Sequence, residues 1–157
     1  MANLDTAERT AQLESTYKRN VSPSYRALQA PLRIASFGTI TLTGDSDAVN
    51  DTITLGNLGC GGRIIPELCR IVGTAGTVGG TFKVQKVNAA GTATDITGTA
   101  AISVDETAVA FTRKAGAATG ADFEATDYLR LLITAASALT ATDTVELYLA
   151  FSTDETV

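Results

Sequence analysis

The sequence of 157 residues contains no histidine and no tryptophan, and its single methionine is the first residue. Without histidine, the chain cannot use Ser-His-Asp or Cys-His catalysis, bind zinc or haem through histidine, or sense pH through an imidazole. No run approaches the roughly 18 apolar residues of a membrane-spanning helix. Acids stand near the N-terminus, where a secretory signal peptide needs bases. We therefore expect a protein that is made in the cytoplasm, is not exported through a signal peptide and does not enter a membrane.

Cysteine is scarce as well. Cys60 and Cys69 stand nine positions apart, and without a second pair they fit no zinc-binding pattern. Cys69 belongs to an apolar strand expected over residues 63–72 and bent at Pro66, which predicts a small buried side chain. Cys60 lies in a glycine-rich stretch that is typical of a turn. A disulfide would require this turn and the strand to fold back on each other, so the sequence favours free thiols.

Charge and composition both change near residue 33. Residues 1–33 carry five bases against three acids, a net +2, and residues 34–157 carry seven bases against fourteen acids, a net −7. The first segment holds the only extended helix-compatible run, residues 5–18, and Pro23 and Pro31 then discourage helix continuation. So short a helix is marginal alone in water. We predict a partly helical N-terminal arm over residues 1–32 and a folded domain over residues 33–157.

From Arg33 onward, apolar and polar residues alternate with the period of a β-strand. About eight such stretches follow one another, and turns rich in glycine and aspartate separate them. No helical pattern lies between them, so the sequence predicts an all-β domain, an antiparallel β-sandwich that is jelly-roll-like. In the first strand, Ile34, Ile40 and Leu42 are expected to share one face. The expected core residues are Ile40, Leu42, Ile53, Leu55, Phe82, Val84, Phe111, Leu131, Ile133, Leu147, Leu149 and Phe151.

Two groups of acidic residues offer clustered oxygen atoms that could hold calcium on a loop. The EF-hand pattern fails at the first group, because Val49 stands where an oxygen ligand belongs and no glycine follows it. Solvated turns, in which Asp and Asn accept hydrogen bonds from nearby backbone, are far commoner, and the sequence favours them. A glycosidase carboxylate pair is disfavoured, because only nine Phe and Tyr residues could wall a cleft. The groups are Asp45, Asp47, Asn50 and Asp51, and Asp122, Glu124 and Asp127.

The remaining motifs point to a protein partner and to no cofactor or metal. The glycine run at residues 73–80 lacks the Lys-Ser/Thr ending of a phosphate loop, and a β pattern follows it, so we expect a turn. The acidic body disfavours nucleic acid, because phosphate contacts need clustered bases. The bases of the arm fit an acidic protein surface better. The residues expected to bind a partner are Tyr17, Lys18, Arg19, Tyr25, Arg26 and Arg33.

Two stretches of the chain carry a family resemblance. The first runs through Leu55-Gly56-Asn57-Leu58, a glycine pair and Arg63-Ile64-Ile65-Pro66; the second holds Asp127-Tyr128-Leu129-Arg130-Leu131 and Val145-Glu146-Leu147-Tyr148-Leu149. Together with the composition rich in Thr, Ala and Gly, they make residues 34–152 similar to small structural proteins of tailed-bacteriophage virions. Capsid decoration or cement proteins are the best match in size within that group.

The resemblance implies a non-enzymatic protein that binds the outside of a phage capsid and bridges capsomers. It implies the major capsid protein or another virion protein as partner, self-association with a trimer favoured, and a place on the virion after synthesis in the host cytoplasm. Two alternatives stay open: another virion component in the neck, tail or fibre, and a receptor- or glycan-binding module. Glycan sites usually show exposed aromatic platforms, for which Tyr128 and Tyr148 are the outward-facing candidates.

Overall fold

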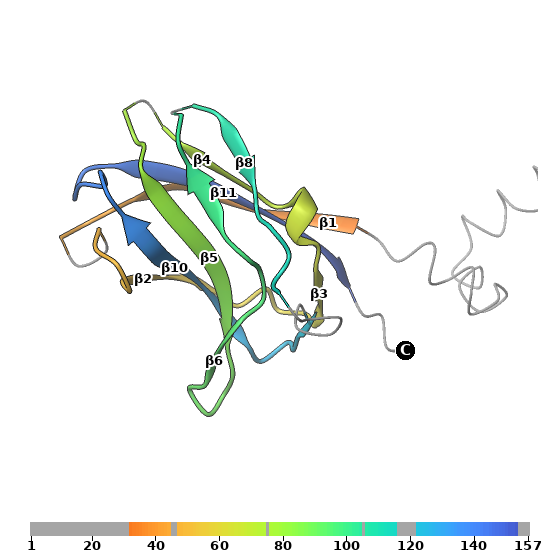
Figure 1. Ribbon diagram of the computed structural model, residues 1–157. Coiled ribbons are helices and arrows are strands. Elements are labelled where there is room, and N and C mark those ends of the chain that lie inside the picture. The colour runs from red at the N-terminus through yellow and green to blue at the C-terminus, as the bar shows by residue number, and fades with distance from the viewer. Residues whose placement is uncertain (1–31, 45–46, 75, 105, 116–121, 154–157) are drawn as a thin grey trace, which may run out of the picture. The chain divides into compact units, whose positions relative to one another are not determined.

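A computed structural model of the protein describes residues 32–44, 47–74, 76–104, 106–115 and 122–153. The chain divides into two units between Pro31 and Leu32, and the described residues belong to the second. They confirm the all-β prediction, whereas the expected helical arm lies outside them (Figure 1). The elements are β1 (Leu32–Thr41), β2 (Thr52–Gly56), β3 (Gly62–Ile64), the 3₁₀ helix η1 (Pro66–Leu68), β4 (Arg70–Gly73), β5 (Gly80–Val87), β6 (Ala93–Asp95), β7 (Ala100–Ile102), β8 (Ala108–Ala110), β9 (Asp122–Phe123), β10 (Tyr128–Ala136) and β11 (Thr144–Thr153).

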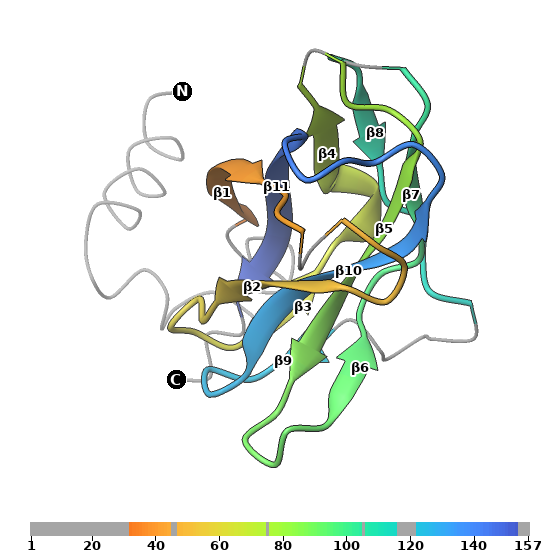
Figure 2. The same cartoon turned by 90° about the vertical axis from the view of Figure 1, so that its left-hand side faces the viewer.

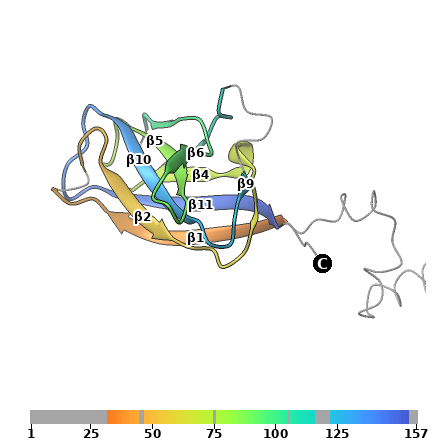
Figure 3. The ribbon, with the colours of Figure 1, turned by 90° about the horizontal axis from the view of Figure 1, so that it is seen from below.

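These strands form two antiparallel sheets. In the first sheet, β1 pairs with one edge of β11, and β4 and β3 pair end to end with the other. β8 and β9 then pair with β4 and β3. In the second sheet, β2, β10 and β5 follow one another, and β6 and β7 share the far edge of β5 (Figure 2). Figure 3 shows β1 beside β11 and β2 beside β10.

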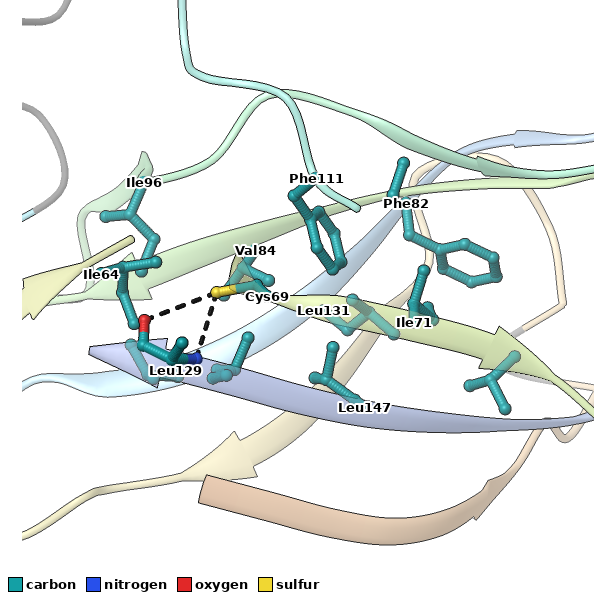
Figure 4. Packing of buried hydrophobic residues seen from close by; sticks show 14 of the residues in the cluster. Ile64, Cys69, Ile71, Phe82, Val84, Ile96, Phe111, Leu129, Leu131 and Leu147 are labelled. Atoms are coloured by element: carbon teal, nitrogen blue, oxygen red, sulfur yellow. Dashed lines mark hydrogen bonds between the residues drawn. The ribbon is translucent and has the colours of Figure 1, made fainter. Parts of the chain in front are cut away.

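Apolar side chains from both sheets pack into one core (Figure 4). Leu129, Leu131 and Ile133 of β10 and Val145, Leu147 and Leu149 of β11 are fully buried. Nine of the twelve expected core residues are buried. The other three, Ile40, Ile53 and Leu55, are partly buried and pack against the same cluster.

The shared face predicted for Ile34 and Ile40 is wrong, because β1 contains a β-bulge. Between Ser36 and Thr39, three steps along β1 match two steps along β11. The extra residue reverses the alternation, so Ile40 packs against the core while Ile34 is 67% exposed. Gly38 lies in the bulge with a φ of 63°, a conformation that glycine adopts without a steric penalty.

Interrupted strands explain why the structure has eleven strand segments in its described part, whereas the sequence predicts about eight strands. Residues 63–72 form β3 and β4, which η1 separates, so the predicted bend at Pro66 is confirmed. β6 and β7 likewise lie along one neighbour, β5, with a short break between them. No helix among the described residues has the length and apolar character that a membrane span requires.

Candidate functional site

Of the six residues predicted to bind a partner, Arg33 alone lies among the described residues. It is the second residue of β1, and its side chain is exposed. No carboxylate in the described ranges forms an ion pair with it. The remaining five, Tyr17, Lys18, Arg19, Tyr25 and Arg26, lie outside the described residues, and their role stays a prediction.

Arg33 belongs to an exposed surface at the start of β1, which we call the β1 border: Leu32, Arg33, Ile34 and Ser36. Leu32 and Ile34 are among the most exposed large apolar residues of the described chain, at 52% and 67%. The alternate residues Ala35 and Phe37 pack against the core. Sequence reasoning missed this surface because the bulge that turns Ile34 outward depends on pairing with β11.

The first acidic group is drawn into a turn. Asp51 accepts a hydrogen bond from the Ala48 N–H at 2.8 Å through Oδ2, and the Asp51 N–H donates to the Ala48 carbonyl at 3.1 Å. Asp45 lies outside the described residues. Across the described ranges, no three Cys, Asp or Glu side chains gather as a possible metal site. Asp51 therefore accepts a hydrogen bond from nearby backbone, as expected for a carboxylate in a turn.

The second acidic group is divided among separate partners. Asp122 Oδ1 accepts from Arg63 Nε at 2.8 Å, at the exposed edge formed by β9 and β3. Asp127 is buried, accepts the Glu124 N–H at 3.0 Å and lies 3.7 Å from Lys86 Nζ. Lys86 also donates to the Asp122 carbonyl at 2.7 Å. These carboxylates hold loops and strands together and do not converge on one point.

A polar network crosses three strands of the second sheet. Asp95 of β6 accepts from Gln85 at 2.6 Å and from Lys83 at 3.1 Å, both on β5, and Arg130 of β10 donates to Gln85 at 2.8 Å. Partial burial raises the pKa of Asp95, but the hydrogen bonds from Gln85 and Lys83, together with the charges of nearby lysines, lower the pKa below its ordinary value. The carboxylate therefore stabilises the fold above the ordinary aspartate pKa and ceases to do so as the pH falls through the lowered one.

The two candidate glycan-stacking tyrosines lie on different sheets. Tyr128 begins β10 in the second sheet and is exposed. Tyr148 lies in β11 of the first sheet, where its hydroxyl donates to Glu146 at 2.8 Å. This hydrogen bond to a carboxylate raises the pKa of Tyr148. The two rings therefore do not form one aromatic platform.

Cys69 has the buried position that the sequence predicts, and both cysteines are free. Its sulfur accepts the Ala150 N–H at 3.3 Å and lies 3.5 Å from the Ala150 carbonyl oxygen (Figure 4). The sulfur also donates to the carbonyl of Ile65 at 3.3 Å. Burial raises the pKa of the Cys69 thiol to about 11, and the hydrogen bond with Ala150 offsets only part of this effect. Cys60 is partly exposed.

We expect iodoacetamide to alkylate Cys60 and to spare Cys69 in the folded protein at pH 8. The thiolate is the reacting form, and the raised pKa leaves almost none of it at Cys69. Mass spectrometry before and after unfolding in guanidinium chloride checks this, with one alkylated thiol first and two afterwards. Cys60→Ser is the control and should abolish the first reaction. Equal rates at both cysteines in the folded protein would contradict the burial of Cys69.

Comparisons of the chain with family models, with curated proteins and with solved structures gave no match. A proposed function therefore depends on the pairing of the strands, on the β1 border and on the distribution of charge along the chain.

Proposed function

We propose that this protein is a structural component of a tailed-phage virion, of the decoration or cement type, which binds the outside of the capsid and bridges capsomers. The proposal includes a jelly-roll topology, a partly helical arm over residues 1–32 that meets the partner, self-association and the absence of catalytic activity. Its partner is the major capsid protein or another protein of the virion.

The order of strand pairing is the observation that carries this proposal. If β3 with β4, β6 with β7, and β8 with β9 each count as one interrupted strand, the chain has eight strand positions. The first then pairs with the last, the second with the seventh, the third with the sixth and the fourth with the fifth. Such nested antiparallel pairing across two sheets supports a jelly roll, an architecture that viral capsid domains use.

The distribution of charge supports a docking role for the arm. Residues 1–33 carry a net +2 and residues 34–157 a net −7, so the molecule has an electrical polarity that can orient its approach. A capsid lattice presents the same surface many times, and weak contacts add up through avidity when copies are linked. An arm that orders on its partner adds contact area without enlarging the domain.

A receptor- or glycan-binding module is the second candidate, because lectins also use jelly rolls. The positions of Tyr128 and Tyr148 on different sheets weigh against it, since a glycan platform needs neighbouring rings. A neck, tail or fibre component would share the fold, but it would bind at a different place on the virion and in a different number of copies.

Co-sedimentation of the full-length protein with capsid shells of the phage that encodes it tests the proposal. We expect saturable binding that is weakened several-fold by the double substitution Lys18→Gln and Arg19→Gln. The matched control is Arg113→Gln with Lys114→Gln, which removes two adjacent bases from the sandwich and should leave binding unchanged. Equal effects of the two pairs would remove the arm from the interface, and no binding of the full-length protein would contradict the capsid role.

A further inference from the structure

The backbone of β1 directs hydrogen-bonding groups toward its free edge at every second residue. Ala150 of β11 points both of its groups away from β1, because its N–H donates to Cys69 Sγ and its carbonyl accepts from the Ile65 N–H at 2.9 Å. Ile34 is the residue opposite Ala150 in the antiparallel register. In such a pair both residues direct their groups outward. The N–H and carbonyl of Ile34 therefore face the free edge, and by alternation those of Leu32 and Ser36 do so too.

This edge lacks most of the features that keep sheet edges from pairing. Natural edge strands are usually very short, or carry Lys, Pro or a bulge. β1 has ten residues, and its bulge comes only after Ser36, so residues 32–36 form a regular strand. On the face that carries Leu32, Ile34 and Ser36 no side chain is charged, and the one charged residue of the stretch, Arg33, alternates with them on the other face. Within the part of the chain that the structure describes, no strand pairs with this edge.

We propose that the β1 border pairs with the same border of a second copy, antiparallel, about a twofold axis at Ile34. This register places Ile34 opposite Ile34 and Leu32 opposite Ser36. Each residue whose N–H and carbonyl face the edge therefore lies opposite a residue of the other copy whose N–H and carbonyl also face it. Arg33 falls opposite Ala35 of the partner, and no two arginines oppose each other. Isologous twofold contacts are the commonest in protein oligomers. The inference does not rest on the capsid proposal, because it involves only this chain.

The edge of β1 is better suited to pair with a second copy than the edges of the other outer strands are. β6, β7, β8 and β9 have two or three residues each, and β2 has five, with threonines exposed. The stretch 32–36 has the common length of a paired strand, about five residues. It is a small interface, and interfaces below about 1,200 Å² are typical of weak association. We therefore expect a reversible dimer that forms as the concentration rises.

Sedimentation velocity and amide hydrogen exchange on the full-length protein, each over a range of concentrations, test this pairing. We expect a shift from monomer to dimer, accompanied by slower exchange at Leu32, Ile34 and Ser36. The amides of Arg33 and Ala35 serve as internal controls, because they face β11 and should not change with concentration. Protection at the three edge residues that is independent of concentration would mean that the same chain covers the edge, and it would overturn the proposal.

Two substitutions at Ile34 test whether the β1 border, and not another surface, forms the dimer. Ile34→Pro removes an N–H that β11 does not use, and Ile34→Lys places a charge at the twofold axis. Each should raise the dimer dissociation constant at least tenfold while the melting temperature changes little. The matched control is Val104→Lys, at an apolar residue that is 57% exposed, and it should change neither quantity. A monomer at every concentration, a dimer insensitive to both substitutions, or a trimer without a dimer step would contradict the proposal.

Discussion

Leu131→Ala is expected to lower the free energy of unfolding by about 2–5 kcal/mol. Leu131 is fully buried near the middle of β10, where it pairs with Ile53 of β2 on one side and with Val84 of β5 on the other. Backbone hydrogen bonds hold both neighbouring strands in place, so the sheet cannot collapse fully into the space left by the lost methyl groups. Urea denaturation followed by circular dichroism measures the change.

The matched control is the same substitution at Leu68, which lies in η1 with its side chain about half exposed. Because Leu68 contributes little to the core, Leu68→Ala should change the free energy of unfolding by no more than about 0.5 kcal/mol. Similar losses for the two variants would contradict the assignment of the core to the space between the two sheets.

Gly73→Ala is expected to destabilise the fold by about 1–3 kcal/mol, although it adds only one methyl group. Gly73 ends β4 and pairs with Val145. An added Cβ would meet the Thr77 carbonyl oxygen and would lie 2.9 Å from Ile102 Cγ2. Neither neighbour can easily move, because Thr77 is buried with its hydroxyl accepting from the Thr144 N–H at 3.2 Å, and Ile102 is part of the core.

Gly44→Ala provides the comparison for this second prediction. A Cβ at Gly44 would have no atom within 4 Å, and its φ is not in the left-handed region. The substitution should be neutral or stabilise by up to about 1 kcal/mol, because alanine restricts the unfolded chain. If thermal and chemical unfolding gave the same loss at both positions, the close approach of the Thr77 loop to β4 would be wrong.

Most of the fold could be predicted from the sequence, because a strand that is buried on one face shows alternating apolar and polar residues. The core residues expected in β10 and β11 are buried, although the alternation in β11 breaks at Ala150, which is buried between Leu149 and Phe151. β6 and β9 have only three and two residues, too short to show a period, so no sequence pattern marks them as strands. The bulge in β1 was missed because a bulge is defined by its partner strand, and the partner of β1 lies more than 100 residues away.

The candidate sites were less predictable, because they depend on register and topology. The burial of Cys69 follows from its apolar neighbours and was predicted. The network around Asp95 requires the pairing of β5 with β6 and with β10, which no local pattern specifies. The separation of Tyr128 from Tyr148 likewise depends on which sheet each strand joins. The acidic groups were predicted as loop residues, but their separate partners Arg63 and Lys86 come from distant strands.

The number of copies bound per capsid at saturation tests the proposed function most directly. Quantitative mass spectrometry of shells incubated with excess full-length protein and then purified would give this number. We predict a plateau at a fixed multiple of the icosahedral symmetry, with copies spread over the whole lattice in electron micrographs. Binding confined to one vertex would indicate a neck or tail component, and the absence of any plateau or any binding would contradict a decoration role.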